Sequence, residues 1–243
     1  MCAGYGLELS GPNSDRSDRA GRLGAIPPGD TAHGRALLEA WVAERHGRAR
    51  ITGRNAHNLN PLIRVHDGER QLVLGWWWLH VGGEPAKFSA FNSRSDRLVS
   101  SWHAPFQHRA LLPANWYLEK GVRFALPEGE QFGMAAVTSP AAENLDSYSL
   151  VTRGALGGAA EVHDRMPLVL PRELHDEWLD PARAGDAELV RAVIARSEEI
   201  SRELRPIGPD SAPGSAPGRA PGSAPGSSTT RSSRPTDEQP TLF

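Results

Sequence analysis

Short apolar segments separated by turn residues fill the middle of the chain, between residues 51 and 170. Their length and spacing are typical of strands in a mostly antiparallel sheet. The pattern predicts strands that begin at Leu62, Gln71, Lys87, Arg109, Val122, Phe132, Tyr148 and Pro167.

Three other segments carry apolar residues at helical spacing. In the first, residues 36–46, Leu37, Leu38 and Trp41 lie on one face, and Gly47 follows as a stop signal. The other two are residues 172–179 and 186–204, the second with an apolar stripe along its length. Strands followed by helices predict an α+β fold.

The composition changes abruptly beyond Leu204. A repeat rich in Pro, Gly and Ser follows, without apolar side chains large enough to build a core. Such a segment is expected to be disordered. The sequence therefore predicts a folded domain over residues 2–204, a disordered linker over 205–238 and a separate peptide at 239–243.

Charge and composition narrow the class of protein. The 243 residues are 39% hydrophobic and carry a net charge of −2, which is not the overall basicity usual for nucleic-acid binders. One segment does gather basic residues, as a phosphate-binding or merely solvated surface would: Arg45, His46, Arg48, Arg50, Arg54, His57, Arg64, His66 and Arg70. We find no signal peptide and no run long enough to cross a bilayer, so we expect a cytoplasmic protein without membrane contact.

The strongest chemical candidate is Cys2, the only cysteine in the sequence. Removal of Met1 would leave it with a free α-amine, of pKa about 7.7 to 8.0, beside a thiol of pKa about 8.5. Such a 1,2-aminothiol condenses with an aldehyde to an imine and then to a thiazolidine ring. The alternative is that Cys2 is a small buried hydrophobic residue.

Four separated fragments give Cys2 a context: MCAGYG at Met1, FNSRSD at Phe91, RALLPANWYLEK at Arg109 and VHDRMPLVL at Val162. In this order they resemble the SRAP (SOS response-associated peptidase) family, whose members attach covalently to abasic sites in single-stranded DNA. The resemblance implies a barrel-like core of mostly antiparallel strands with peripheral helices.

Carried over position by position, the resemblance gives Cys2 the role of covalent nucleophile. Asn92, Glu119 and His163 would be the other catalytic residues, and Arg94 and Arg165 would contact DNA. An abasic sugar must open to its aldehyde before it reacts. A histidine and a carboxylate suit the proton transfers, and an asparagine can position the amine without titrating.

Two further matches are looser. The run HNLNP at His57 would place Asn58 and Pro61 near DNA, and three consecutive tryptophans begin at Trp76. Alternation along a strand puts Trp76 and Trp78 on one face and Trp77 on the other. One face is expected in the core, while the other can stack on a splayed base; Trp76 and Trp78 are the candidates for DNA binding.

The chain also departs from the family pattern. The family's Met-Cys-Gly-Arg start is replaced, since Ala3 and Gly4 follow Cys2, so an arginine near the nucleophile is missing. Around Glu119, NWYLEK replaces Asp-Gly-Phe-Tyr-Glu-Trp.

The last five residues, QPTLF, resemble the Gln-x-x-Leu-Phe peptide that binds the bacterial sliding clamp. Leu242 and Phe243 would fill an apolar pocket, while Gln239 makes polar contacts. A flexible linker before this peptide would hold the domain near clamp-loaded DNA.

The sequence thus predicts a monomeric, nucleoid-associated protein that crosslinks to abasic single-stranded DNA without metal or cofactor. A lyase side activity would follow from the imine stage. Two alternatives remain open: an N-terminal-nucleophile peptidase or amidohydrolase that uses the same Cys2, and a non-catalytic DNA-binding module associated with the clamp.

Overall fold

The structure is a computed structural model that describes residues 2–9 and 25–208. The peptide predicted at Gln239–Phe243, with Leu242, lies outside the described residues, as does the linker beyond residue 208. No helix in the described part is long and apolar enough to cross a membrane.

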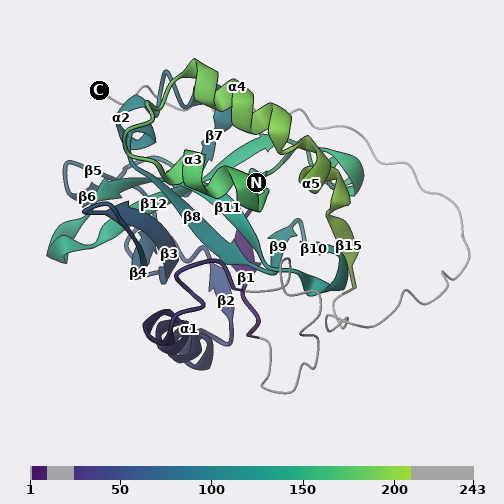
Figure 1. Cartoon of the computed structure of the whole chain (residues 1–243), viewed down its shortest axis with the longest axis horizontal. Coiled ribbons are helices and arrows are strands. Elements are labelled where there is room, and N and C mark those ends of the chain that lie inside the picture. The colour runs from purple at the N-terminus through teal and green to yellow at the C-terminus, as the bar shows by residue number, and fades with distance from the viewer. Residues whose placement is uncertain (1, 10–24, 209–243) are drawn as a thin grey trace, which may run out of the picture.

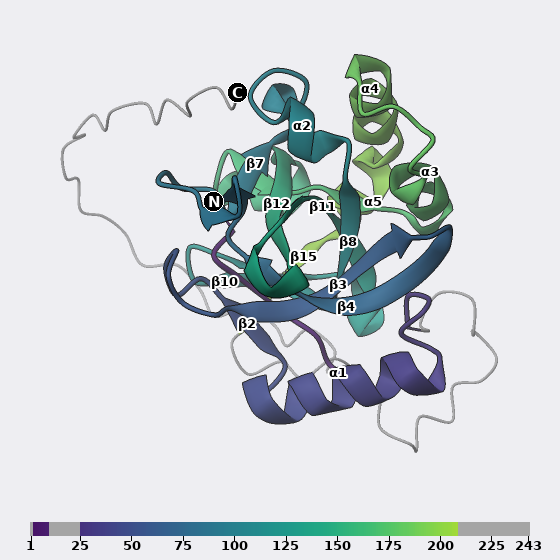
Figure 2. The same cartoon turned by 90° about the vertical axis from the view of Figure 1, so that its left-hand side faces the viewer.

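A closed ring of five strands forms the core (Figure 2). Around the ring these strands are β12 (Asp146–Gly154), β4 (Glu69–Trp77), β3 (Leu59–His66), β8 (Arg109–Ala114) and β11 (Phe132–Pro140). The ring closes because β12 pairs in parallel with β4 on one side and antiparallel with β11 on the other. Three short strands extend it: β7 (Asn92–Arg94) and β13 (Arg165–Pro167) on β12, and β14 (Val169–Leu170) on β11.

A second, antiparallel sheet brings the N-terminus into the domain. Its order is β15 (Arg205–Ile207), β10 (Val122–Ala125), β9 (Trp116–Glu119), β1 (Gly4–Gly6) and β2 (Arg48–Arg50). Tyr5, Tyr117 and Phe124 face inward and are fully buried. A small hairpin of β5 (His80–Val81) and β6 (Glu84–Pro85) forms a third, two-stranded sheet.

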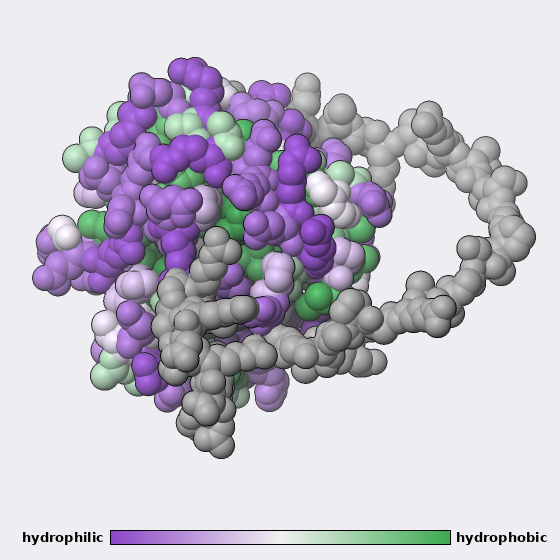
Figure 3. Space-filling model, turned by 45° about the vertical axis from the view of Figure 1, so that its right-hand side comes forward, coloured by the Kyte–Doolittle hydropathy of each residue, from purple (hydrophilic) through white to green (hydrophobic). Residues whose placement is uncertain are grey.

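The helices lie outside the strands (Figure 1). Helix α1 (Ala32–Arg45) lies beside β2 and β3, whereas α2 (His103–Phe106), α3 (His175–Leu179), α4 (Ala187–Arg196) and α5 (Glu198–Glu203) lie on the other side of the core. Single 3-10 turns connect elements at Ser95–Arg97, Pro127–Gly129, Ala142–Asn144, Gly157–Glu161 and Arg172–Leu174. Hydrophilic residues cover most of the described surface seen in Figure 3.

The predicted α+β class and the barrel-like, mostly antiparallel core are confirmed. One predicted strand is in fact two, because Asn115 leaves the barrel at the end of β8: its backbone N–H donates to Gly6 O and its side chain binds Glu8 N and Gly129 O, each at 2.8 Å. The chain then enters the second sheet as β9. No strand forms at residues 87–91, where the chain bends instead.

The last predicted helix is also divided, and the domain continues past it. Arg153 donates to Ile194 O at 2.9 Å and to Ser197 Oγ at 2.8 Å, and α4 ends there before α5 begins. After α5, residues Arg205–Ile207 pair with β10. The folded part therefore extends beyond Leu204, the boundary that composition predicts.

Candidate active site

Cys2 lies two residues before β1, with its side chain buried, 1% exposed. Its thiol donates to Gly4 O at 3.2 Å. The backbone beside it is held from the β2 side, since Ile51 N–H donates to Ala3 O at 3.1 Å. The sheet therefore fixes the position of the Cys2 end of the chain.

Asn92 reaches Cys2 from the barrel. Its Nδ2 donates to the Cys2 carbonyl oxygen at 2.8 Å, and its side chain is buried. Asn92 begins β7, which pairs in parallel with β12 so that Asn92 lies opposite Leu150. This contact joins the second sheet to the barrel at the candidate nucleophile.

Glu119 places a carboxylate near the same thiol. It is the last residue of β9, which pairs with β1, and it is 3% exposed. Burial raises the pKa of the Cys2 thiol to about 12; the hydrogen bond to Gly4 acts in the opposite direction, and the charge of Glu119 raises the pKa further. The thiol is therefore protonated at neutral pH, and its attack needs a proton acceptor.

Buried hydroxyl groups surround this pair, a feature that the sequence analysis missed. Tyr5 and Tyr148 share a hydrogen bond of 2.7 Å between their hydroxyl oxygens, and Asn60 hydrogen-bonds Tyr148. The Tyr117 hydroxyl has no hydrogen-bond partner among the described residues. Burial, followed by the charges of Cys2 and Glu119, raises the pKa of Tyr117 well above its usual value. Alternation could have identified it, since Tyr117 precedes Glu119 by two positions.

His163 lies in a second group, with Arg165. The Arg165 backbone N–H donates to His163 Nδ1 at 2.9 Å, while Asp164 Oδ1 lies 2.7 Å from the same nitrogen. Both contacts hold the His163 ring through Nδ1, and Asp164 itself is largely exposed.

Asp96 joins the two predicted DNA-binding arginines. It accepts two hydrogen bonds from Arg94, at 3.1 and 2.8 Å, and lies 3.6 Å from Arg165 Nη1. Arg94 is exposed, whereas Arg165 is mostly buried. The side chain of Asp96 lowers the net positive charge that these arginines offer to a phosphate. Its place in FNSRSD was visible in the sequence, but its role was not predicted.

Hydrogen bonds connect the two groups. Thr152 Oγ1 donates to Ser93 O at 3.2 Å, next to Asn92, and Arg165 Nη2 lies 3.2 Å from the same hydroxyl. The structure thus brings Cys2, Asn92 and Glu119 together and links them through β7 and β12 to His163 and Arg165.

The HNLNP segment is ordered close to Arg50. Asn58 Nδ2 donates to Arg50 O at 2.7 Å, and Asn60 Nδ2 donates to Asn58 O at 3.0 Å. Asn58 and Pro61 are both buried, and Pro61 lies within β3. The side chain of Asn58 thus ties this segment to β2.

The side chains of Trp76, Trp77 and Trp78 follow the predicted alternation between strand faces only in part. Trp77 lies in the core, stacked on Tyr148 at 6.1 Å, whereas Trp76 lies between His57 and His80, with ring centroids at 4.4 and 4.8 Å. The expectation that Trp78 shares the face of Trp76 is wrong. Strand β4 ends at Trp77, and Trp78 packs on Phe91, as Trp77 does.

The basic segment is not one surface. Arg64 pairs with Asp146, Arg70 pairs with Asp176 and Arg45 pairs with Glu44. Arg48 and Arg50 remain exposed on β2.

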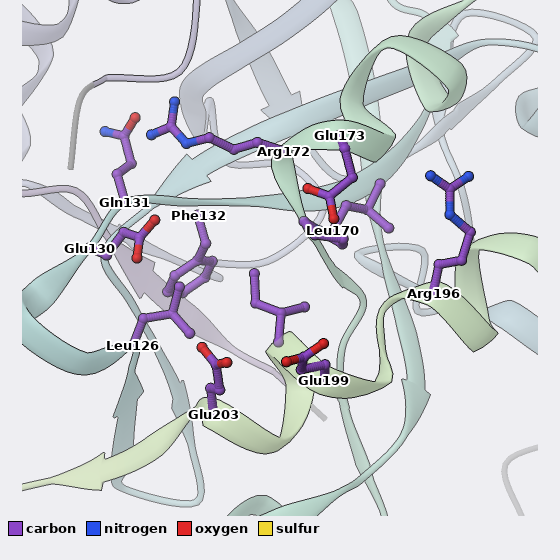
Figure 4. Close-up of a pocket in the computed structure, with 12 residues that line it drawn as sticks. Leu126, Glu130, Gln131, Phe132, Leu170, Arg172, Glu173, Arg196, Glu199 and Glu203 are labelled. Carbon is purple, nitrogen blue, oxygen red and sulfur yellow. The ribbon is translucent and has the colours of Figure 1, made fainter. Parts of the chain in front are cut away.

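A separate pocket of about 280 Å³ lies between β14, α5 and the end of β10 (Figure 4). Leu126, Phe132 and Leu170 form its apolar part, and four glutamates line it: Glu130, Glu173, Glu199 and Glu203. None of the predicted site residues lines this pocket. Within residues 2–9 and 25–208, no cluster of three or more His, Cys, Asp and Glu side chains could hold a metal ion.

Comparison with known proteins identifies solved structures that are similar to this chain. No curated protein matches the chain. A phage-related protein from Bordetella bronchiseptica is 23% identical, with 61% of this chain and 78% of that chain covered and a TM-score of 0.48. A second structure from Bordetella bronchiseptica is 17% identical, with 76% and 90% covered and a TM-score of 0.50, so it shares the fold.

The family comparison covers most of the domain described above. The sequence model of SOS response associated peptidase (SRAP) matches residues 40–210, which include Asn92, Glu119 and His163. Because this match spans more than half of the chain, the protein belongs to the SRAP family, whose members are associated with the response to DNA damage.

Proposed function

We propose that the protein, after loss of Met1, forms a covalent thiazolidine crosslink with abasic sites in single-stranded DNA. The observation that carries the proposal is the arrangement around Cys2: its carbonyl is held by Asn92 and its thiol lies within the electrostatic reach of Glu119. Family membership supports a role in DNA damage. Cys2 is thereby fixed just before a strand, where a free α-amine would be held in place.

The reaction begins at nitrogen. The neutral α-amine of Cys2 adds to C1′ of the ring-opened sugar, and the resulting carbinolamine loses water to give an imine. The Cys2 sulfur then adds to the imine carbon, and its proton passes to the nitrogen. The sequence forms one C–N and one C–S bond and releases one water molecule.

Glu119 and His163 serve the proton transfers. Because burial holds the Cys2 thiol protonated, Glu119 accepts the sulfur proton as the C–S bond forms. His163 transfers protons during ring opening and loss of water. Arg94 and Arg165 position the phosphates, and the imine stage permits a lyase side reaction.

The two candidate reactions differ in the atom that attacks first. In a cysteine peptidase the thiol itself attacks the amide and needs an adjacent base, which Glu119 would supply. In the aldehyde reaction the amine attacks first, and the thiol completes a ring that is already tethered. Cleavage of peptides in trans by the same Cys2 is the second candidate.

The test is a denaturing gel with a single-stranded oligonucleotide that carries one abasic site. Mature wild-type protein should give a slowly migrating adduct that resists boiling. Cys2→Ala and Cys2→Ser keep the α-amine, so each should give an adduct only when the imine is trapped with borohydride. Absence of an adduct with mature wild-type protein would refute the proposal. Cleavage of a peptide library by protein that forms no adduct would support the peptidase.

The proposal includes the sliding clamp as a partner through Gln239, Leu242 and Phe243. Large apolar side chains at the end of a polar segment suit an extended peptide that docks in an apolar pocket. Deletion of Leu242 and Phe243 should abolish binding to purified clamp and leave the adduct with free abasic DNA unchanged. Equal clamp affinity before and after the deletion would contradict this part. A cytoplasmic, nucleoid-associated location would follow from both partners.

A further inference from the structure

The outward face of the second sheet carries a row of arginines. Inward positions of this sheet hold Tyr5, Tyr117 and Phe124, so the alternate positions face away from the core. Across the strands these outward positions form two rows, which are Arg50, Gly4, Leu118, Arg123 and Ile207 in the first and Arg48, Gly6, Trp116, Ala125 and Arg205 in the second. We call this surface the arginine face.

No acidic residue occupies the outward positions of the arginine face. Both rows lack a carboxylate, and Arg48, Arg50 and Arg205 are exposed. Within the described residues, none of the four arginines forms an ion pair; Arg205 donates only to Arg202 O, at 3.4 Å. On a chain of net charge −2, such a single-sign surface selects for an anionic partner.

The centre of the face is built to hold a guanidinium in place. Trp116 is 6% exposed but lies outside the hydrophobic core, with its ring flat over Gly6: a Cβ on Gly6 would lie 2.1 Å from Cζ2 of Trp116. The guanidinium of Arg123 lies 4.5 Å above the ring. Only glycine at position 6 allows this stack. A guanidinium oriented by an aromatic ring presents its N–H groups to a phosphate at a smaller entropic cost.

The arginine face leads to the candidate active site. Arg50 lies directly opposite Gly4, two residues from Cys2, and its carbonyl oxygen accepts the hydrogen bond from Asn58. Three strand spacings, about 14 Å, separate β2 from β10. A chain of phosphates that crosses the sheet can therefore contact Arg50 and Arg123 and continue to the Cys2 end of β1.

We propose that the arginine face binds the phosphate backbone of single-stranded DNA that flanks the lesion. The choice of single-stranded DNA rests on the proposed function, while the binding surface itself rests on charge, exposure and the Trp116–Arg123 stack. Phosphate contacts of this kind are independent of sequence and weaken with salt.

The test uses an undamaged 5′-labelled oligonucleotide, about 20 nucleotides long, and fluorescence anisotropy over a salt series. The variant Arg48→Gln/Arg50→Gln/Arg123→Gln should bind at least about tenfold more weakly at low salt. The slope of log K against log salt should fall by about 2, since each lost phosphate contact on a single strand accounts for about 0.7. Lysine at the same three positions should restore most of the slope.

A matched variant controls for total charge. Arg70→Gln/Arg183→Gln/Arg196→Gln removes the same three charges from arginines that are paired with acids elsewhere. This variant should keep the wild-type slope. The single variants Arg50→Gln and Arg123→Gln should each lower the slope by about 0.7.

An unchanged slope in the single variants, or an equal loss in the control, would overturn the inference. Tighter binding of a duplex of the same length would assign the face to duplex DNA and also overturn it. Undamaged DNA cannot form the crosslink, so the result is independent of Cys2 chemistry. Failure of the proposed function would appear instead as a missing adduct with abasic DNA, while the variants still change the salt slope as expected above.

Discussion

The side-chain amide of Asn92 donates to the carbonyl oxygen of Cys2 at 2.8 Å, although the two residues are 90 positions apart. The contact ties the first strand of the second sheet to a short strand on the barrel. The contact is made to the backbone carbonyl of Cys2 and does not involve the thiol. Under the proposed function, Asn92 is a residue that positions the nucleophile.

Asn92→Ala should slow crosslinking by about 10- to 100-fold in single-turnover assays, because small displacements of a reacting group have effects of this size. Affinity for undamaged DNA should stay unchanged. Asn115→Ala is the control: it removes hydrogen bonds at another buried asparagine and should lower stability while the rate of the folded protein is kept. Equal rates for Asn92→Ala and wild type would contradict the positioning role.

Tyr117→Phe should raise the free energy of unfolding by about 1 kcal/mol. The hydroxyl is buried without a partner among the described residues, and its removal relieves that desolvation cost. The ring keeps its stack on Phe124, at 5.1 Å. Tyr5→Phe, which loses a 2.7 Å hydrogen bond to Tyr148, should instead be destabilised by about the same amount. Urea denaturation of the two variants compares them directly, and a less stable Tyr117→Phe would show that the hydroxyl is satisfied.

Trp76 and Trp78 should respond differently to the same change. Trp78 Nε1 donates to Ala86 O at 2.9 Å, so Trp78→Phe leaves a buried carbonyl without its donor and should cost about 1 to 3 kcal/mol. Trp76 Nε1 has no partner in the described part of the chain, so Trp76→Phe loses only ring packing and should cost less than Trp78→Phe. Thermal unfolding of both variants checks this difference, and equal losses would contradict it.

The sequence predicts those elements of the structure that are marked by a local pattern of apolar residues. The short apolar runs of β4 and β11 and the helical stripe of α4 predict those elements well, because each is set by its own neighbours. The break at Asn115 depends on Glu8, Gly6 and Gly129, none of which is near it in the sequence. The end of α4 depends likewise on Arg153 from β12.

The candidate site likewise contains residues that the sequence predicts and residues that it does not. The order of the motifs predicts Cys2, Asn92 and Glu119 as a group, and the structure brings them together. Tyr117 and Asp96 were missed because their significance lies in what they face across strands. The arginine face was hidden for a similar reason: Arg48, Arg50, Arg123 and Arg205 come from three distant parts of the sequence and meet only in the sheet.

The buried thiol predicts a pH dependence of stability. In the folded protein the pKa of Cys2 is raised to about 12, mainly by burial, whereas an unfolded chain has a thiol pKa of about 8.5. Above about pH 9 the unfolded state therefore loses a proton that the folded state keeps. The contribution of this group to stability is fully present below the unfolded pKa and is lost as pH rises toward the folded pKa.

The difference in free energy of unfolding between wild type and Cys2→Ala should accordingly fall as pH rises from about 9 to about 11, by at most about 1.4 kcal/mol per pH unit. Tyr5, Tyr117 and Tyr148 also have raised pKa values, but both variants contain them, so their effect cancels in the difference. Urea denaturation at a series of pH values measures it. Parallel curves for the two proteins would mean that the thiol is accessible to water in the folded state, and a thiolate could then act without help from Glu119.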